Sequence, residues 1–111
     1  MENTKTSVLK GTSASPGRAS GMVKIVKELG DLDKITDQDI MVVGENNPIY
    51  ATGLMQCKGL ICEKGGLLSH ICIVAGELGI PCLVDANGAL EKLSDNDHIV
   101  LDADEGTVYF G

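Results

Sequence analysis

The chain has 111 residues, about the length of one domain, and its 43% hydrophobic and 23% charged residues are typical of an ordinary soluble globule. Sixteen acidic residues against nine basic ones give a net charge of −7, which makes nucleic acid and anionic membranes poor candidate partners. Aromatic residues make up only 3%, with no Trp, so the core must be aliphatic and a base-stacking platform is not expected.

The opening segment, MENTKTSVLKG, contains no apolar signal sequence, and no run in the chain approaches the ~18 apolar residues that span a bilayer. We therefore expect a cytoplasmic protein. Residues 1–111 are expected to form a single domain, and Met1 together with compact ends favours a natural stand-alone chain over an excised domain.

Turn-forming residues mark the first element boundaries. The segment SASPGRASG, residues 13–21, predicts a turn that joins an opening segment at 7–11 to a strand over 22–26. Residues 28–39 are polar and predict an irregular connector. The short apolar run IMVV, residues 40–43, is typical of a buried strand.

The polar connector carries four aspartates: Asp31, Asp33, Asp37 and Asp39. Their spacing lacks the glycine and the terminal Glu of a calcium loop. We therefore expect a solvated acidic stretch there and no metal site.

Asn47 and Pro48 predict a helix start, because Asn is a good capping residue and Pro suits the first helical position. The predicted helix covers about 48–57 and stops before Gly59. The following GLICE, residues 59–63, predicts another short buried strand.

The segment GGLLSHICIVAGELGIP, residues 65–81, predicts a glycine loop followed by a helix over about 69–78. Ser69 suits the N-cap position, Gly79 supplies a C-terminal stop and Pro81 prevents continuation.

The last third of the chain predicts a strand over 82–86, one helical turn over 87–93, and a final hairpin of 98–104 with 106–111. Strands that alternate with helices in the middle of the chain indicate parallel pairing with right-handed crossovers, whereas the flanking segments favour antiparallel pairing. We expect a mixed-sheet α/β domain of about 6 to 8 short strands.

His70 stands between the glycine loop and the predicted helix. Gly65 and Gly66 allow backbone angles that turn amides inward, and the free N–H groups at a helix start stabilise an anion. A neutral imidazole there is a nucleophile that can attack phosphorus, and the product places its charge where the helix favours it. The arrangement suits a phosphate carrier, with Gly65, Gly66 and Ser69 as the candidate phosphate cradle. On spacing alone, a capping or surface histidine remains the alternative.

Four cysteines, Cys57, Cys62, Cys72 and Cys82, fit no paired C-x-x-C zinc pattern, so we expect reduced and mostly buried thiols. Cys72 lies two residues from His70 and therefore on a different helix face. A thiol enzyme that uses Cys72 is a further alternative, which predicts rapid alkylation, although nothing near it in the sequence is expected to lower its pKa.

Several ordered segments together resemble one family. The segment EKGGLLSHICIVAGELGIPCLV is similar to the signature of the phosphohistidine, or swivelling, domain of phosphoenolpyruvate-utilising enzymes. That family includes phosphoenolpyruvate synthase, pyruvate phosphate dikinase, the first enzyme of the sugar phosphotransferase system and rifampin phosphotransferase. Residues that match its pattern are Gly65, Gly66, Ser69, His70, Ile73, Val74, Ala75, Glu77, Leu78, Gly79, Ile80 and Pro81. The stretches GTSASPGRASGMV, DIMVVGENNPIYATGLMQCKGLICEKGG and LSDNDHIVLDADEGTVYFG extend the resemblance over most of the chain.

The resemblance implies that His70 is the phosphorylated residue of a mixed-sheet swivelling β/β/α domain. It also implies two kinds of partner protein: a nucleotide-binding unit that phosphorylates the histidine from ATP, and a barrel unit that binds pyruvate or phosphoenolpyruvate. Magnesium and ATP would belong to those partners, with no cofactor held tightly by this domain. Pyruvate, a sugar-transport protein and an antibiotic all fit the family as final acceptors.

The sequence departs from the family pattern near His70. Leu68 stands where the family has Thr, Gly76 where it has Arg, and Ile71 and Cys72 where it has small residues. A non-catalytic binding or regulatory module that keeps the swivelling fold is therefore the alternative to a phosphoryl carrier.

Overall fold

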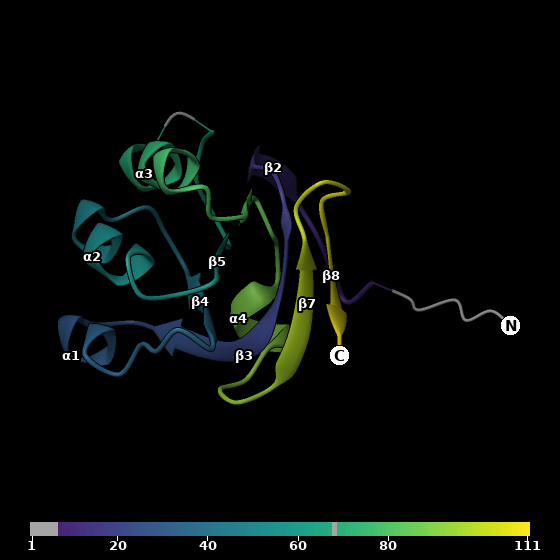
Figure 1. Cartoon of the computed structure of the whole chain (residues 1–111). Coiled ribbons are helices and arrows are strands. Elements are labelled where there is room, and N and C mark those ends of the chain that lie inside the picture. The colour runs from purple at the N-terminus through teal and green to yellow at the C-terminus, as the bar shows by residue number, and fades with distance from the viewer. Residues whose placement is uncertain (1–6, 68) are drawn as a thin grey trace, which may run out of the picture.

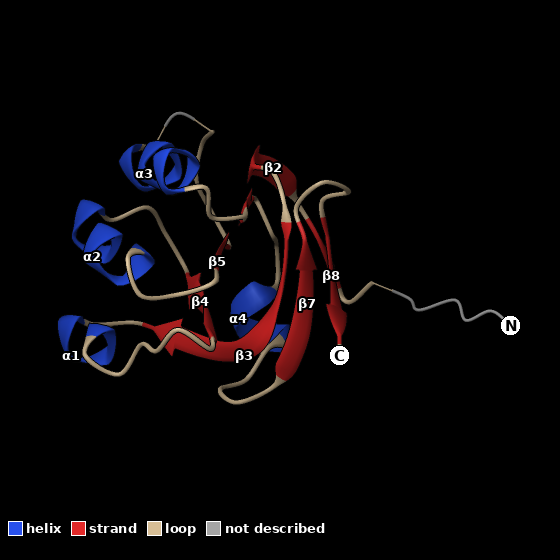
Figure 2. Ribbon diagram, in the orientation of Figure 1, coloured by secondary structure: helices blue, strands red, loops and turns tan. Residues whose placement is uncertain are grey.

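Eight strands form one sheet in the part of the chain that the computed structural model describes, residues 7–67 and 69–111. Their order across the sheet is β1-β8-β7-β3-β4-β5-β6-β2. The strands are β1 (Leu9–Lys10), β2 (Thr12–Ser15), β3 (Arg18–Val26), β4 (Asp39–Val43), β5 (Gly59–Cys62), β6 (Cys82–Val84), β7 (His98–Asp102) and β8 (Thr107–Phe110). The helical elements are α1 (Leu29–Leu32), the 3-10 helix η1 (Pro48–Tyr50), α2 (Ala51–Leu54), α3 (His70–Leu78) and α4 (Ala89–Lys92). This mixed α/β architecture confirms the predicted fold class (Figure 2).

Strands β3, β4, β5 and β6 pair in parallel, and α1, α2 and α3 lie in the connections between them. The other pairs, β7 on β3, β8 on β7, β1 on β8 and β2 on β6, are antiparallel. The predicted division into a parallel centre and antiparallel flanks is therefore correct.

The two outermost strands of the sheet are consecutive in the chain. Only Gly11 separates β1, which pairs with β8, from β2, which pairs with β6. The Gly11 amide donates to the Gly106 carbonyl at 2.9 Å, and a Cβ on Gly11 would come within 2.5 Å of the Val84 oxygen. The segment through Gly11 thus connects the two edges of the sheet and brings them together.

Side chains on the two faces of the sheet form two separate hydrophobic clusters. Along β4, Ile40 and Val42 belong to the cluster that includes Ala89 of α4, which we call the inner cluster. Met41 and Val43 belong to the cluster that includes Ile71 of α3, which we call the outer cluster. The strand period of two produces this division, and burial of both faces explains why the central strands read as continuous apolar runs. The inner cluster includes Ala86, Ala89 and Leu93, and Figure 1 shows α4 within the curve of the sheet.

The outer face of the central strands is covered by α1, α2 and α3 (Figure 1). In α3, Ile71, Cys72 and Ala75 are buried and pack into the outer cluster. This packing fixes the start of α3 against the sheet.

No helix of the described ranges 7–67 and 69–111 is both long and apolar enough to cross a membrane.

The turn predicted over 13–21 is wrong in extent. Residues up to Ser15 belong to β2 and those from Arg18 belong to β3, so only Pro16 and Gly17 form the turn. Gly17 has φ +125°, and its amide donates to Asp104 Oδ1 at 2.9 Å. Antiparallel pairing of Arg18 to Met22 with β7 extends β3 at its N-terminal end, and this partner is distant in sequence.

The connector at 28–39 is also more ordered than predicted. Its start forms α1, where the Asp31 carboxylate accepts from the amides of Lys27 and Glu28. Asp39 is 6% exposed rather than solvated, and its Oδ2 accepts from the Thr36 amide at 2.9 Å.

The helix predicted over 48–57 is shorter and begins as a 3-10 turn. Asn47 caps it, because its Oδ1 accepts from the Ile49 amide at 3.2 Å, and α2 ends at Leu54. The predicted helix over 69–78 is confirmed, with Gly79 in the left-handed region at φ +72°.

Candidate functional site

Helix α3 begins at His70 because the backbone of Ser69 is extended, with φ −67° and ψ 155°. The Ser69 carbonyl accepts the first bond of the helix, from the Ile73 amide at 3.1 Å. Amides in the first turn of a helix have no carbonyl partner inside it, and they make this end partly positive. His70 therefore stands at the anion-stabilising end of a helix of nine residues.

The imidazole of His70 lies on the surface. Within the described part of the chain, no hydrogen bond holds its ring. An exposed ring is accessible to an incoming group, which a ring packed in the core would not be.

The loop before Ser69 depends on glycine at one position. Gly65 has φ +136°, and a Cβ on it would lie 2.6 Å from Asn46 Cγ. Gly66 is not in the left-handed region, and no atom lies within 4 Å of where its Cβ would be. Of the two glycines, which both allow such backbone angles, only Gly65 adopts one.

Ser69 uses its polar groups within the loop. Its amide donates to the Gly66 carbonyl at 3.2 Å, and its hydroxyl donates to Asn46 Oδ1 at 3.0 Å. Ser69 occupies the predicted N-cap position of α3, but its side chain makes no capping bond to the helix. A hydroxyl that is already donating must change partner before it can donate to a phosphate oxygen.

Asn46 is the residue that sequence reasoning missed. Its Oδ1 accepts from Ser69 Oγ and from Cys62 Sγ, the latter at 3.6 Å, and its carboxamide lies against Gly65. Asn46 follows β4 and the glycine loop follows β5, and the carboxyl ends of parallel strands meet at one edge of a sheet. No local pattern marks Asn46 as part of the site, because its role depends on this shared edge of the folded sheet.

Two exposed apolar residues flank His70 in the sequence. Leu67 is 49% exposed and Ile73 is 50% exposed. Residues three apart on a helix share a face, so Ile73 lies beside His70. We call Leu67 and Ile73 the apolar rim.

Two buried thiols, one of them in the first turn of α3, contact each other. Cys72 Sγ and Cys82 Sγ are 3.9 Å apart, and both side chains belong to the outer cluster. The hydrogen bond from Cys82 lowers the pKa of Cys72 to about 6 and raises the pKa of Cys82. The largest cause, Cys82, is ten residues away in sequence, but Ser69 also lowers the pKa of Cys72. The expectation that nothing near Cys72 in the sequence lowers its pKa is therefore wrong, because Ser69 is only three residues away.

The remaining thiols are free and have raised pKa values. Burial raises the pKa of Cys57 to about 11 and that of Cys62 to about 12. Cys62, Cys72 and Cys82 are buried, as predicted, and Cys57 is partly buried. Because Cys72 is only 2% exposed, a bulky substrate has no direct access to its sulfur.

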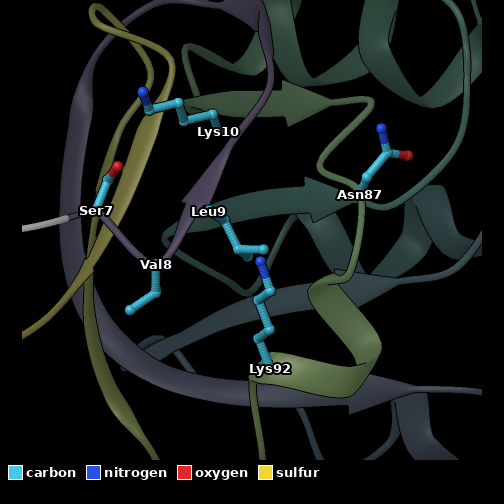
Figure 3. A pocket seen from close by; sticks show the side chains of 6 residues that line it. All are labelled: Ser7, Val8, Leu9, Lys10, Asn87 and Lys92. Atoms are coloured by element: carbon cyan, nitrogen blue, oxygen red, sulfur yellow. The ribbon is translucent and has the colours of Figure 1, made fainter.

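Two surface depressions have linings that do not include His70. One is lined by Lys27, Glu45, Glu63 and Lys64 among others, at the edge where β3, β4 and β5 end. The other, shown in Figure 3, is lined by Ser7, Val8, Leu9, Lys10, Asn87 and Lys92. Among the residues placed by the structure, no group of three or more His, Cys, Asp or Glu side chains is arranged to hold a metal ion.

The sequence predicted His70, Ser69, Gly65 and Gly66 as the site, and the structure brings them together at one end of α3. Their roles toward phosphate stay predictions. Leu68 lies outside the described residues. Gly76 is exposed, and no atom lies within 4 Å of the position that a Cβ would take, so packing does not require glycine there.

Residues 35–106 match the family model described as PEP-utilising enzyme, mobile domain. A probable phosphoenolpyruvate synthase of Methanothermobacter thermautotrophicus is 42% identical over 104 residues, which cover 94% of this chain and 15% of that protein. The phosphoenolpyruvate synthase of Pyrococcus furiosus is 36% identical over 104 residues, 94% of this chain and 13% of that protein. The chain thus spans only about one seventh of the length of these relatives.

Among solved structures, an NMR structure of Enzyme I aligns with a TM-score of 0.62 and 22% identity, over 72% of this chain and 33% of that one. Aconitase X of Thermococcus kodakaraensis aligns with a TM-score of 0.68 and 20% identity, over 93% of this chain and 97% of that one. At these identities the likeness establishes a shared fold and nothing further.

Proposed function

The chain belongs to the family of PEP-utilising enzyme mobile domains, and on that premise we propose that it carries a phosphoryl group on His70. The group is relayed between ATP and pyruvate or phosphoenolpyruvate, each bound by a partner unit. The observation that carries the proposal is the exposed imidazole at the first residue of α3.

The chemistry needs a neutral imidazole and a place for negative charge. The lone pair of one ring nitrogen forms a bond to phosphorus while the donor's P–O bond breaks, and the donor oxygen keeps the electron pair. In the second half-reaction the N–P bond breaks as an acceptor oxygen bonds to phosphorus. The partly positive start of α3 stabilises the phosphoryl group between these steps.

The apolar rim supports docking of the partner units around His70. Exposed Leu67 and Ile73 offer apolar area that a docked partner would bury, and Ile73 shares a helix face with His70. The nucleotide and magnesium are held by one partner and the pyruvate by another, whether these are separate chains or further parts of a longer one. The free thiols favour the cytoplasm as the compartment.

The direct test is phosphorylation in trans. The chain is incubated with radiolabelled ATP, or with labelled phosphoenolpyruvate, and a phosphoenolpyruvate synthase relative whose own mobile-domain histidine is replaced by alanine. Label that is acid-labile and base-stable is expected on this chain, absent from His70→Ala and retained in His98→Ala. His98 is the matched control, because it is exposed and lies on β7.

A non-catalytic binding module is the second candidate, and the engaged Ser69 hydroxyl favours it. Absence of label on the folded chain, while the relative's own isolated mobile domain is labelled in the same mixture, would exclude the carrier. Saturable binding to the partner in that experiment would then support the binding module.

A further inference from the structure

Cys72 and Cys82 form a contact that phosphoryl transfer does not use. Cys72 is the third residue of α3, and Cys82 is the first residue of β6. Their sulfur atoms are 3.9 Å apart, whereas a disulfide bond is about 2.05 Å long. Rotation of the two side chains, or a small shift of the helix turn, has to close the remaining gap.

We propose that Cys72 and Cys82 are a reversible dithiol–disulfide pair that ties the first turn of α3 to β6. Disulfides in the cytoplasm are usually transient and redox-sensing, and a pair placed beside a functional helix suits that use.

With hydrogen peroxide as the oxidant, the formation of the Cys72–Cys82 disulfide balances in atoms and electrons. The Cys72 thiolate attacks one peroxide oxygen, the O–O bond breaks, and hydroxide leaves to take up a proton as water. Cys82 then attacks the sulfur of the Cys72 sulfenic acid, and the S–O bond breaks with loss of a second water. Two thiols are oxidised to one disulfide, and one peroxide is reduced to two waters. Peroxide is small enough to reach a sulfur that larger reagents cannot.

The environment of Cys72 favours it over the other thiols as the one that attacks peroxide. The S–H of Cys82 donates to it and lowers its pKa, and it lies in the first turn of a helix, where a thiolate is stabilised. Cys57 Sγ instead donates to the Gly59 carbonyl at 3.3 Å. Cys62 Sγ donates to Asn46 and to the Lys64 carbonyl. Burial raises the pKa of both of these thiols.

The consequence for His70 rests on the proposed function, whereas the bond itself does not. His70 lies two residues before Cys72 in the same helix turn. Drawing Cys72 toward Cys82 moves that turn relative to the glycine loop, so oxidation is expected to slow the labelling of His70.

The test of the bond uses the whole chain and needs no partner. The protein is treated with hydrogen peroxide, quenched in acid, unfolded, alkylated and analysed by mass spectrometry. We expect a product that has lost two hydrogen atoms, carries two alkyl groups and yields a peptide cross-linked between Cys72 and Cys82. Dithiothreitol is expected to restore four alkylatable thiols.

Three variants separate the possible outcomes. Cys57→Ser and His70→Ala should oxidise like the parent chain. Cys82→Ser should stop at a Cys72 sulfenic acid, which dimedone traps when it is added together with the denaturant. Peptides that remain unlinked at peroxide doses that convert Cys72 to sulfinic acid, or links that join other cysteines, would overturn the proposal. Should Cys82→Ser fail to fold, peptide mapping of the parent chain decides alone. A disulfide without any slowing of His70 labelling would refute only the functional consequence.

Discussion

The Asn46 carboxamide oxygen lies 3.0 Å from the Ser69 hydroxyl, and this hydrogen bond ties the loop after β4 to the residue before α3. Two segments that are 23 residues apart thereby hold the start of the His70 helix. The position of His70 thus depends on a neighbouring loop as well as on its own.

Replacing Asn46 tests that dependence. Asn46→Ala removes the acceptor for Ser69 and should lower the free energy of unfolding by about 1 kcal/mol, the usual net value of such a bond. Asn46→Asp keeps an acceptor but adds a negative charge near the proposed phosphoryl group, so it should lower His70 labelling about tenfold with little change in stability. Urea unfolding and labelling in trans measure the two effects.

Asn47→Ala is the matched control for Asn46. It removes the cap on η1 and should cost about 1 kcal/mol of stability as well. Its labelling rate should stay that of the parent chain. Equal labelling by Asn46→Asp and Asn47→Ala would show that Asn46 has no electrostatic link to the phosphoryl group.

Substitutions of the adjacent Gly65 and Gly66 should have unequal effects on stability. Gly65→Ala puts a Cβ against the Asn46 carboxamide at φ +136°, and should destabilise the chain by about 2 kcal/mol. Gly66→Ala meets open space and should change stability by about 0.5 kcal/mol or less. Thermal or urea unfolding of both variants makes the comparison, and similar losses would contradict the loop geometry.

The local elements of this site could be read from the sequence, whereas their mutual contacts could not. Helix α3 was predictable because apolar periodicity, Ser69 and Gly79 all lie within one short segment. The role of Asn46 and the Cys72–Cys82 contact depend on which strands become neighbours. Such neighbours are set by the packing of the whole sheet and leave no local pattern.

The same reason explains the errors in the fold. The early part of β3 reads as a turn because Pro16 and Gly17 come directly before it and Gly21 lies within it, yet pairing with β7 makes it a strand from Arg18 onward. The connection of the two sheet edges through Gly11 likewise involves Gly106 and Val84, which are far away in sequence.

Gly76 offers a stabilising substitution. It lies exposed within α3, and nothing lies within 4 Å of the position of its missing Cβ. Gly76→Ala should therefore raise the free energy of unfolding by about 1 kcal/mol through helix propensity. Gly79→Ala is the contrasting control: it should destabilise the chain, because Gly79 is left-handed at φ +72°. A loss of stability in Gly76→Ala would mean that α3 does not continue past Ala75.

The decrease in the free energy of unfolding at acidic pH should depend on Asp31. Backbone hydrogen bonds, first that from Lys27, hold the pKa of Asp31 below its ordinary value in the folded chain. Its contribution is therefore fully present above the ordinary pKa, and is lost as the pH falls through the lowered one. Asp31→Asn should reduce stability at pH 7 and flatten the decline below about pH 4. Urea midpoints between pH 2.5 and 7, at about 0.5 pH spacing, give both curves, and parallel curves would rule out this role.

The apolar rim predicts a defect in partner recognition without a defect in folding. Ile73 is 50% exposed on the same helix face as His70, so Ile73→Ser removes area that a docked partner would bury while exposing no core. Labelling in trans should require a several-fold higher concentration of this variant for half-maximal rate, because about 1 kcal/mol of apolar contact is lost. Leu29→Ser is the matched control, since Leu29 is 61% exposed on α1, at the other end of the helical layer from α3 (Figure 1). Its labelling should follow that of the parent chain. If both variants lose activity equally, or neither does, the partner does not dock on the rim.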